Sequence, residues 1–232
     1  MNNHLSTEQQ QELQQLADVQ KKKQAARNAA ALPKSMSQII EQQKRRGLRP
    51  ADNRIHLCCQ GDARDLLMHG LVYLLGERAK WLPEYDEITE WLTDNDGRGL
   101  MCIGDCGRGK TIITQRILPL LFERGRIRSA KGQKLIYNTH TALDLLDHFQ
   151  EIAYGTLICI DDVGTEPRMK KFGVTHDYFS ELVDLCERHE KLLVCSTNLS
   201  GEELQERYGL RTFDRLTSLT RRVFFEGQSQ RI

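Results

Sequence analysis

A glycine-rich stretch in the middle of the chain has the residue types that bind phosphate. It reads Gly104-Asp105-Cys106-Gly107-Arg108-Gly109-Lys110-Thr111 and fits the pattern G-x-x-x-x-G-K-[ST] in full. The glycines let the backbone curl so that its N–H groups point at phosphate oxygens, and the helix that follows adds partial positive charge. Lys110 is placed to reach the β and γ phosphates, and Thr111 to offer a hydroxyl to Mg²⁺. The spacing predicts a site for ATP and Mg²⁺.

A site for ATP and Mg²⁺ also needs acidic residues on a strand beside the phosphate loop. A candidate pair follows the loop by about fifty residues. Four apolar residues, 157–160, lead directly into the carboxylates of Asp161 and Asp162. Asp161 is expected to hold Mg²⁺, usually through water, because this ion dehydrates reluctantly. Asp162 is expected to orient or deprotonate the attacking water. A plain strand end followed by a turn would give the same letters, and the preceding phosphate loop favours the functional interpretation.

A third apolar run ends in polar residues at 196–198. Asn198 is placed to stand between the two carboxylates and the γ-phosphate and to hold the attacking water. The alternative is an ordinary strand end with an Asn turn.

These residues need a scaffold of strands alternating with helices. Strands are predicted at 99–103, 134–138, 156–160, 192–196 and 222–225, and helices at 62–80, 84–92, 111–124, 141–149 and 175–189. Several of the strands are apolar throughout, which indicates a parallel sheet covered on both faces.

Composition limits what else the chain can be. Its 232 residues carry a net charge of +1, which gives no global case for nucleic-acid binding. No apolar run is long enough for a membrane span and no secretory signal is readable, so the expected compartment is the cytoplasm. The 7 cysteines include no C-x-x-C pair, which favours reduced thiols over disulfides or zinc.

The first 50 residues differ from the rest. They hold nine Lys or Arg against four acids, a net +5, and therefore leave −4 for the remainder. Strong helix formers follow a capping box at Ser6–Gln9, but the apolar stripe is weak. We expect a helical arm at 1–50 that docks on a partner, and a globular domain at 51–232.

Taken together, four segments resemble the DnaC/IstB group of AAA+ ATPases, which contains helicase loaders and transposition helper ATPases. The resemblance covers about residues 85 to 232. The four segments are Gly104–Thr111, Asp161-Asp162-Val163-Gly164, Ser196-Thr197-Asn198-Leu199-Ser200 and Arg207-Tyr208-Gly209-Leu210-Arg211-Thr212-Phe213-Asp214-Arg215-Leu216. The last segment makes the resemblance specific, since phosphate loops are common to many ATPases. The resemblance implies an α/β, three-layer P-loop AAA+ domain with a parallel sheet. Because the chain ends at Ile232, we expect it to lack a full C-terminal lid domain.

The resemblance also implies roles for individual residues. Nucleotide binding extends from Gly104 through Ile112, Asp161 and Asp162 form the Walker B pair, and Asn198 is the first sensor. Arg215 matches an arginine finger that reaches a neighbouring subunit's ATP, Arg211 assists it, and Arg231 resembles a terminal sensor arginine. The alternative for Arg215 is a surface residue paired with Asp214 or Glu206. Because Asp162 is one methylene shorter than the Glu of many AAA+ proteins, we expect slow turnover.

The function implied is an ATPase that assembles with itself and loads a replicative helicase onto single-stranded DNA, with residues 1–50 holding the helicase. One alternative is a transposition helper that assembles on duplex DNA and activates a transposase. Another is a nucleotide-dependent binding switch that hydrolyses little. Basic residues at Arg168-Met169-Lys170-Lys171 and at Lys44-Arg45-Arg46 with Arg49 are the candidate phosphate contacts to DNA, and ordinary solvated charge is their alternative.

Overall fold

The fold is described from a computed structural model for residues 38, 39, 41, 45, 53–167, 169–171 and 174–227. The elements below lie in a compact unit that spans Asn53–Ile232. Its strands are β1 (Leu57–Cys59), β2 (Gly99–Gly104), β3 (Ile127–Ser129), β4 (Tyr137–Thr141), β5 (Leu157–Val163), β6 (Met169–Lys171), β7 (Val174–His176), β8 (Leu192–Thr197) and β9 (Thr220–Phe225). Its helices are α2 (Ala63–Leu75), α3 (Glu84–Thr93), α4 (Lys110–Ile112), α5 (Leu118–Glu123), α6 (Leu145–Tyr154), α7 (Tyr178–Arg188), α8 (Gly201–Tyr208) and α9 (Leu210–Leu219). Two further helical segments are the 3-10 turn η1 (Gly76–Arg78) and the π-helical turn η2 (Ile113–Ile117).

The main sheet of the described residues has five strands in the order β4-β5-β8-β2-β9. Every neighbouring pair in it is parallel. The strand before the glycine-rich loop, β2, therefore lies between β8 and β9, and β8 separates it from β5. Because parallel strands end at the same edge, Gly104, Asp161 and Thr197 come to that edge together.

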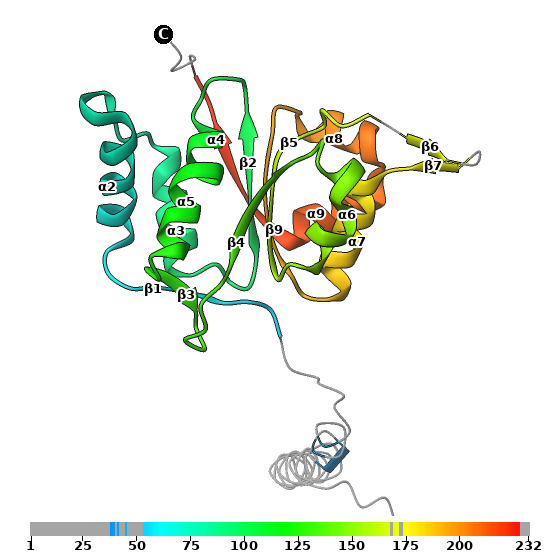
Figure 1. Ribbon diagram of the computed structural model, residues 1–232, viewed down its shortest axis with the longest axis horizontal. Helices are drawn as coiled ribbons and strands as arrows, with labels where there is room; N and C mark the ends of the chain where they lie inside the picture. The colour runs from blue at the N-terminus through cyan, green and yellow to red at the C-terminus, as the bar shows by residue number, and fades with distance from the viewer. Residues whose placement is uncertain are drawn as a thin grey trace, which may run out of the picture. The chain divides into compact units, whose positions relative to one another are not determined.

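Helices cover both faces of this sheet, which gives three layers (Figure 1). The helices α2 to α5 pack on one face over a core that includes Leu67, Trp91 and Phe122. The helices α6 to α9 pack on the other face over a core that includes Phe179 and Leu204. The predicted three-layer α/β P-loop domain with a parallel sheet is confirmed.

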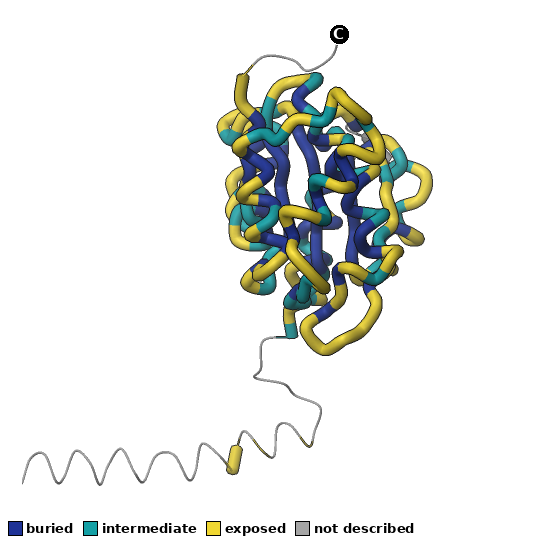
Figure 2. The backbone as a smooth tube through the Cα atoms, turned by 90° about the vertical axis from the view of Figure 1, so that its left-hand side faces the viewer, coloured by how far each residue is buried: buried dark blue, intermediate teal, exposed yellow. Residues whose placement is uncertain are grey.

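The strands are apolar throughout because both of their faces are covered. Along β2, Leu100 and Cys102 belong to one core and Met101 and Ile103 to the other. Strand side chains alternate between the two faces, so each strand supplies both layers. Figure 2 shows the result, with buried strands in the middle and exposed segments around them.

The chain approaches β2 through a tightly packed turn. Asn95 is fully buried, accepts a 2.8 Å hydrogen bond from the Leu57 N–H, and donates to the carbonyls of Ile55 and Arg98. At Gly99 a side chain would overlap the carbonyl oxygen of Leu193 on β8. The turn fixes where β2 begins and, through it, where the glycine-rich loop lies.

The helix after that loop is interrupted by a π-helical turn. The Leu118 N–H bonds to the Ile113 carbonyl, five residues back, and Pro119 follows at the start of α5. Proline has no N–H to continue the α-helical ladder and its ring crowds the carbonyl four residues earlier, so the turn widens here. The predicted helix at 111–124 is therefore three segments, α4, η2 and α5.

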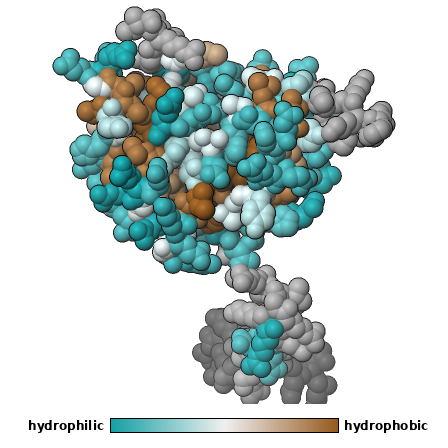
Figure 3. All heavy atoms as spheres, in the orientation of Figure 1, coloured by the Kyte–Doolittle hydropathy of each residue, from teal (hydrophilic) through white to brown (hydrophobic). Residues whose placement is uncertain are grey.

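On the face drawn in Figure 3 most side chains are polar, and apolar side chains gather over α2 at the upper left. Val72, Tyr73 and Leu74 are among the large apolar residues exposed there. No helix in the described part of the chain is long and apolar enough to cross a membrane. All 7 cysteines lie within the described residues, and none of them is paired with another.

Two predicted elements are displaced along the chain. The strand predicted at 134–138 is β4, Tyr137–Thr141, and the helix predicted at 141–149 is α6, Leu145–Tyr154. The residues between them form a turn in which the Asp144 carboxylate accepts a 2.6 Å hydrogen bond from the Thr141 N–H. That turn takes up the start of the predicted helix and moves α6 toward the C-terminus.

Candidate nucleotide-binding site

The glycine-rich loop joins β2 to α4 at the edge of the sheet where the parallel strands end. Gly104 and Gly109 have φ angles of 149° and 93°, which favour glycine. A side chain at Gly104 would also overlap the Phe225 carbonyl oxygen on β9. The loop therefore favours glycine at both positions for conformation, and at Gly104 for space as well.

A cavity of about 310 Å³ lies against this loop. Its volume is in the range of small-ligand sites, about 300–1,000 Å³. Its walls bring together three segments that are far apart in sequence. The lining residues are Cys106, Gly107, Arg108, Gly109, Lys110, Thr111, Ile112, Asp162 and Asn198.

Lys110 is the cation of this cavity. Its Nζ donates hydrogen bonds to the carbonyls of Gly104 and Asp105, at 2.6 and 2.8 Å, and to Oδ1 of Asn198 at 2.8 Å. The residue is buried, and burial lowers the pKa of Lys110 while Cys106 and Asp162 oppose that shift. The Lys110 ammonium group is thus held by carbonyls of the same loop. It lies at the position that the motif predicts for contact with phosphate.

Asp161 lies beneath the cavity, buried at the end of β5. Its Oδ1 accepts a hydrogen bond from Ser196 Oγ on β8 and a 3.2 Å hydrogen bond from Thr114 Oγ1 on η2. Thr111, its expected partner in holding Mg²⁺, is exposed and lines the cavity. Both offer hard oxygen ligands, which suit Mg²⁺.

A protein site for Mg²⁺ beside a nucleotide needs only one or two carboxylates, because phosphates and water complete the coordination. Among the described residues there is no cluster of three or more His, Cys, Asp or Glu side chains that could hold a metal ion. The donor set of Asp161 and Thr111 therefore fits an ion that arrives with a triphosphate, and does not form a complete metal cage.

Asp162 reaches the cavity through a backbone irregularity. The register of β5 against β8 shifts between Ile160 and Val163, and Asp162 has φ 55°, a left-handed conformation that costs a non-glycine residue about 1–2 kcal/mol. Its N–H donates to Ser196 Oγ at 3.1 Å, and its carbonyl accepts from Thr165. Consecutive strand residues point in different directions, and here Asp161 is buried while Asp162 lines the cavity.

Arg108 is expected to bind nucleotide, but its side chain turns to the protein. It forms a 3.1 Å ion pair with Glu84 at the start of α3, and both side chains are only 6% exposed. It also donates to the Glu226 carbonyl after β9. Arg108 contributes to the cavity wall, and its guanidinium holds the loop against α3 and the end of β9.

Arg215 and Arg211 do not line the cavity of their own chain. Arg215 on α9 pairs with Asp184 and, at 2.8 Å, with Glu187, both on α7. The side chain of Arg211 is 76% exposed and lies 3.8 Å from Asp184. The alternative considered for Arg215, a pairing with Asp214 or Glu206, does not hold in its partners, since α7 supplies the acids.

Other predicted residues lie outside the described residues. These include Arg231, Arg168, and Lys44, Arg46 and Arg49 of the N-terminal segment. Lys170 and Lys171 belong to β6, which pairs with β7 in an antiparallel hairpin.

Three polar residues of this region escape sequence reasoning. Thr114 and Ser196 hold Asp161, and the only readable signal for Thr114 is a hydroxyl within an apolar helical stripe. Glu166 follows the bulge, is 5% exposed, and accepts a 2.9 Å hydrogen bond from the Gly164 N–H. An acid in a loop gives no sequence signal of burial.

No known family profile matches the chain, and no curated protein matches it in sequence. Solved structures are similar in fold. The DnaC helicase loader has a TM-score of 0.44 at 15% identity, over 72% of this chain and 93% of that chain. DnaI has a TM-score of 0.43 at 17% identity, over 58% of this chain and 73% of that chain. AMPPCP-bound DnaA from Aquifex aeolicus has a TM-score of 0.43 at 15% identity, over 63% and 48%. At these values the similarity carries no functional conclusion.

Proposed function

We propose that this protein binds and hydrolyses ATP with Mg²⁺ and loads a replicative helicase onto single-stranded DNA. The observation that supports an ATPase most strongly is the meeting of Lys110, Asp162 and Asn198 at one cavity. Phosphoryl transfer to water requires a cation that binds the phosphates and a group that orients or deprotonates the water. Lys110 and Asp162 can supply these, and the Asn198 amide contacts the cation.

Each residue has a chemical task in this proposal. The backbone N–H groups of the loop and Lys110 bind the phosphates, and Thr111 and Asp161 hold Mg²⁺, which neutralises developing charge when bound. Asp162 orients the water or accepts its proton, and Asn198 fixes the position of that water. Ser196 and Thr114 hold the Asp161 carboxylate in place.

Arg215 is proposed to act on the ATP of a neighbouring subunit. Two facts support this role. It does not line its own chain's cavity, and it lies on α9 beside α7, where it is 21% exposed. A guanidinium supplied to the γ-phosphate by another subunit raises the hydrolysis rate by about 10³–10⁵. Asp184 and Glu187 would release Arg215 as subunits assemble.

The choice of a loader over a transposition helper depends on the sequence resemblance and on the segment 1–50. That segment carries a net +5 and strong helix formers, which suit docking on another protein. The ATPase site is the same in both alternatives and does not distinguish them. A nucleotide-dependent binding switch remains the third alternative, and turnover at background level with DNA and partner present would favour it.

The testing experiment is a pull-down from the source organism's lysate with ATP and Mg²⁺. Full-length protein is compared with a version that lacks residues 1–50, and a full-length Lys110→Ala variant controls for nucleotide dependence. Capture of a hexameric replicative helicase, identified by mass spectrometry, only by the full-length protein supports the loader. Capture of a transposase, or of abundant duplex DNA without protein, contradicts it and favours the transposition helper.

A further inference from the structure

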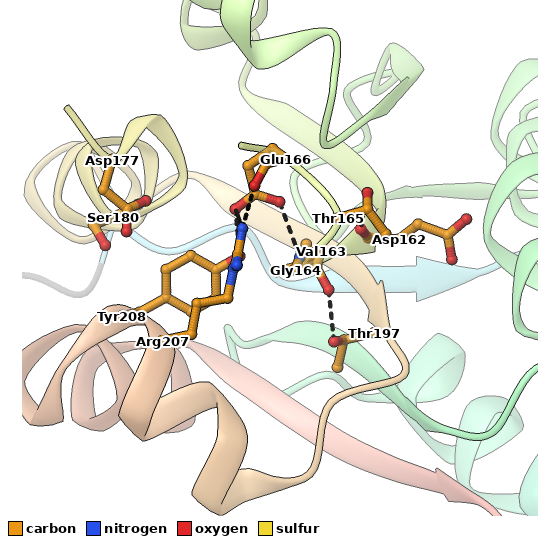
Figure 4. A network of polar contacts seen from close by, with 10 residues as sticks. All are labelled: Asp162, Val163, Gly164, Thr165, Glu166, Asp177, Ser180, Thr197, Arg207 and Tyr208. Carbon is orange, nitrogen blue, oxygen red and sulfur yellow. Dashed lines mark hydrogen bonds and ion pairs between the residues drawn. The ribbon is translucent and has the colours of Figure 1, made fainter. Parts of the chain in front are cut away.

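Glu166 is a buried carboxylate that lies outside the nucleotide cavity. It is 5% exposed and joins the loop after β5 to the end of α8 (Figure 4). One carboxylate oxygen accepts a 2.9 Å hydrogen bond from the Gly164 N–H. The other accepts from the Tyr208 hydroxyl and lies 3.6 Å from an Arg207 nitrogen, which also donates to the Glu166 carbonyl.

This network is stable only as a unit. A buried carboxylate is costly unless hydrogen bonds and an opposite charge compensate it, and here both are present. Burial and the hydrogen bond to Glu166 raise the pKa of Tyr208 well above its ordinary value. Tyr208 therefore stays protonated and remains a donor at any working pH. Removing one partner leaves the others buried without their contacts.

The loop that Glu166 anchors contains two unusual backbone conformations. Asp162 has φ 55° and Gly164 has φ 106°. The Val163 carbonyl between them accepts a 2.7 Å hydrogen bond from Thr197 Oγ1 on β8. The loop is thus held from β8 on one side and from α8, through Glu166, on the other. Figure 4 shows the Asp162 side chain pointing away from the Glu166 network.

We propose that Glu166 is a positioning residue that holds Asp162 at the nucleotide cavity by fastening the 163–166 loop to Arg207 and Tyr208. This inference rests on the proposed ATPase function. A left-handed residue such as Asp162 keeps its conformation only when its surroundings fix it, and the Gly164 N–H bond provides that constraint two residues away. When the bond is lost, Asp162 relaxes and its carboxylate leaves the position of the attacking water.

The anchor also joins two parts of the proposed mechanism. Arg207 and Tyr208 are the last residues of α8, and Gly209, with φ 83°, leads directly into α9 with Arg215. Glu166 therefore joins the loop that follows Asp162 to α8, which leads directly into the helix that carries Arg215, α9. A movement of α9 on subunit contact would reach Asp162 through this one carboxylate.

A purely structural role for Glu166 would give different results. Structural loss lowers thermal stability and weakens nucleotide binding together with turnover. A positioning role lowers kcat and leaves the Kd for nucleotide unchanged, because Glu166 does not line the cavity. If Glu166 acts on kcat only through Asp162, substituting Glu166 has no further effect once Asp162 is also substituted. A double variant therefore separates the positioning role from the structural role.

The test compares Glu166→Gln with Glu203→Gln, a matched change on α8 at an exposed residue whose carboxylate accepts a hydrogen bond from the Ser200 N–H in the helix cap. Steady-state ATP hydrolysis, Kd for a fluorescent ATP analogue and hydrogen–deuterium exchange of residues 162–166 are measured on full-length protein. We expect Glu166→Gln to lower kcat about 10- to 100-fold, with Kd within about twofold and faster exchange in the loop. In an Asp162→Asn background, Glu166→Gln should cause no further loss.

Tyr208→Phe provides a second variant in case Glu166→Gln does not fold. The substitution keeps the aromatic ring, whose centroid lies 5.0 Å from the centroid of the Phe179 ring, and removes only the hydroxyl donor. We expect a smaller fall in kcat, again with unchanged Kd. Wild-type kcat in both folded variants, or an equal further loss in the Asp162→Asn background, would overturn the positioning role. If the wild type does not hydrolyse ATP with DNA and partner present, the proposed ATPase function is rejected. Hydrogen–deuterium exchange of residues 162–166 would then still test whether Glu166 holds the loop.

Discussion

Lys110 Nζ and Asn198 Oδ1 are 2.8 Å apart, although 88 residues separate them in the chain. The contact crosses from the helix after β2 to the loop after β8, two strands that are neighbours in the sheet. It brings the ammonium group proposed to bind phosphate and the amide proposed to position water to one point. A triphosphate that enters must exchange this contact for its own, so the two residues respond to nucleotide together.

Lys110→Ala is expected to abolish nucleotide binding. The substitution removes the only lysine that lines the cavity within the described residues, and the Kd for a fluorescent ATP analogue should rise about 100-fold or more. Lys131→Ala, at an exposed position outside the cavity, is the control and should bind like the wild type. Retained affinity in Lys110→Ala would place the nucleotide elsewhere.

Asp162→Asn should separate binding from hydrolysis. Asparagine tolerates the left-handed conformation at φ 55°, so the backbone stays as it is while the carboxylate is lost. We expect kcat to fall about 10²- to 10⁴-fold with Kd unchanged, as for the loss of a general base. Asp147→Asn, exposed on α6, controls for the charge change. Hydrolysis at the wild-type rate would remove Asp162 from the mechanism.

Arg215→Ala should keep nucleotide binding and lose the hydrolysis that depends on assembly. The relevant measurement is the rate per subunit against protein concentration with DNA present, which should rise for the wild type and stay flat for the variant.

Two further variants make the Arg215 result interpretable. Arg215→Lys keeps a positive charge beside Asp184 and Glu187 and loses the planar fork, so it should fold well and remain inactive. Arg188→Ala, an exposed α7 arginine, should behave like the wild type. If Arg215→Ala hydrolyses ATP like the wild type with DNA, the finger assignment fails.

Gly99→Ala is expected to destabilise the protein by about 3 kcal/mol or more, because a methyl group there overlaps the Leu193 carbonyl oxygen of a buried strand. Gly132→Ala is a suitable comparison, since Gly132 has φ 80° and nothing within 4 Å, and it should cost only about 1–2 kcal/mol. Urea unfolding of both variants measures the difference. Equal losses would show that crowding at Gly99 does not matter.

The meeting of Lys110, Asp162 and Asn198 at one cavity could be predicted from the sequence, because the phosphate-loop pattern requires particular residues at fixed spacing. Nucleotide binding at that cavity stays a prediction. The strand β2, the loop and Lys110 follow one unbroken pattern, and β5 and β8 are apolar runs that end in Asp162 and Asn198. The bulge between Ile160 and Val163 was not predictable, because it depends on register against β8. Thr114 and Glu166 act through contacts with distant segments, which sequence spacing does not show.

The edges of the fold were harder to predict than its centre. The edge strand β4 reads Tyr-Asn-Thr-His-Thr and has no apolar signal, whereas the apolar Ile136 before it is 69% exposed. The prediction followed Leu135 and Ile136 and placed the strand too early. The helix α8 was not predicted although Ser200 and Glu203 form a capping box, a signal that the sequence offers.

The position of β2 between β8 and β9 also has a consequence for how the protein is made. Both neighbours of this strand come from the last part of the chain, with Thr220–Phe225 pairing along Gly99–Gly104. During synthesis the segment 100–103 leaves the ribosome as an apolar strand with two open edges, about 120 residues before its second partner exists. A nascent chain is therefore unable to close its phosphate loop until synthesis has passed Phe225, and it is most vulnerable to aggregation in that interval.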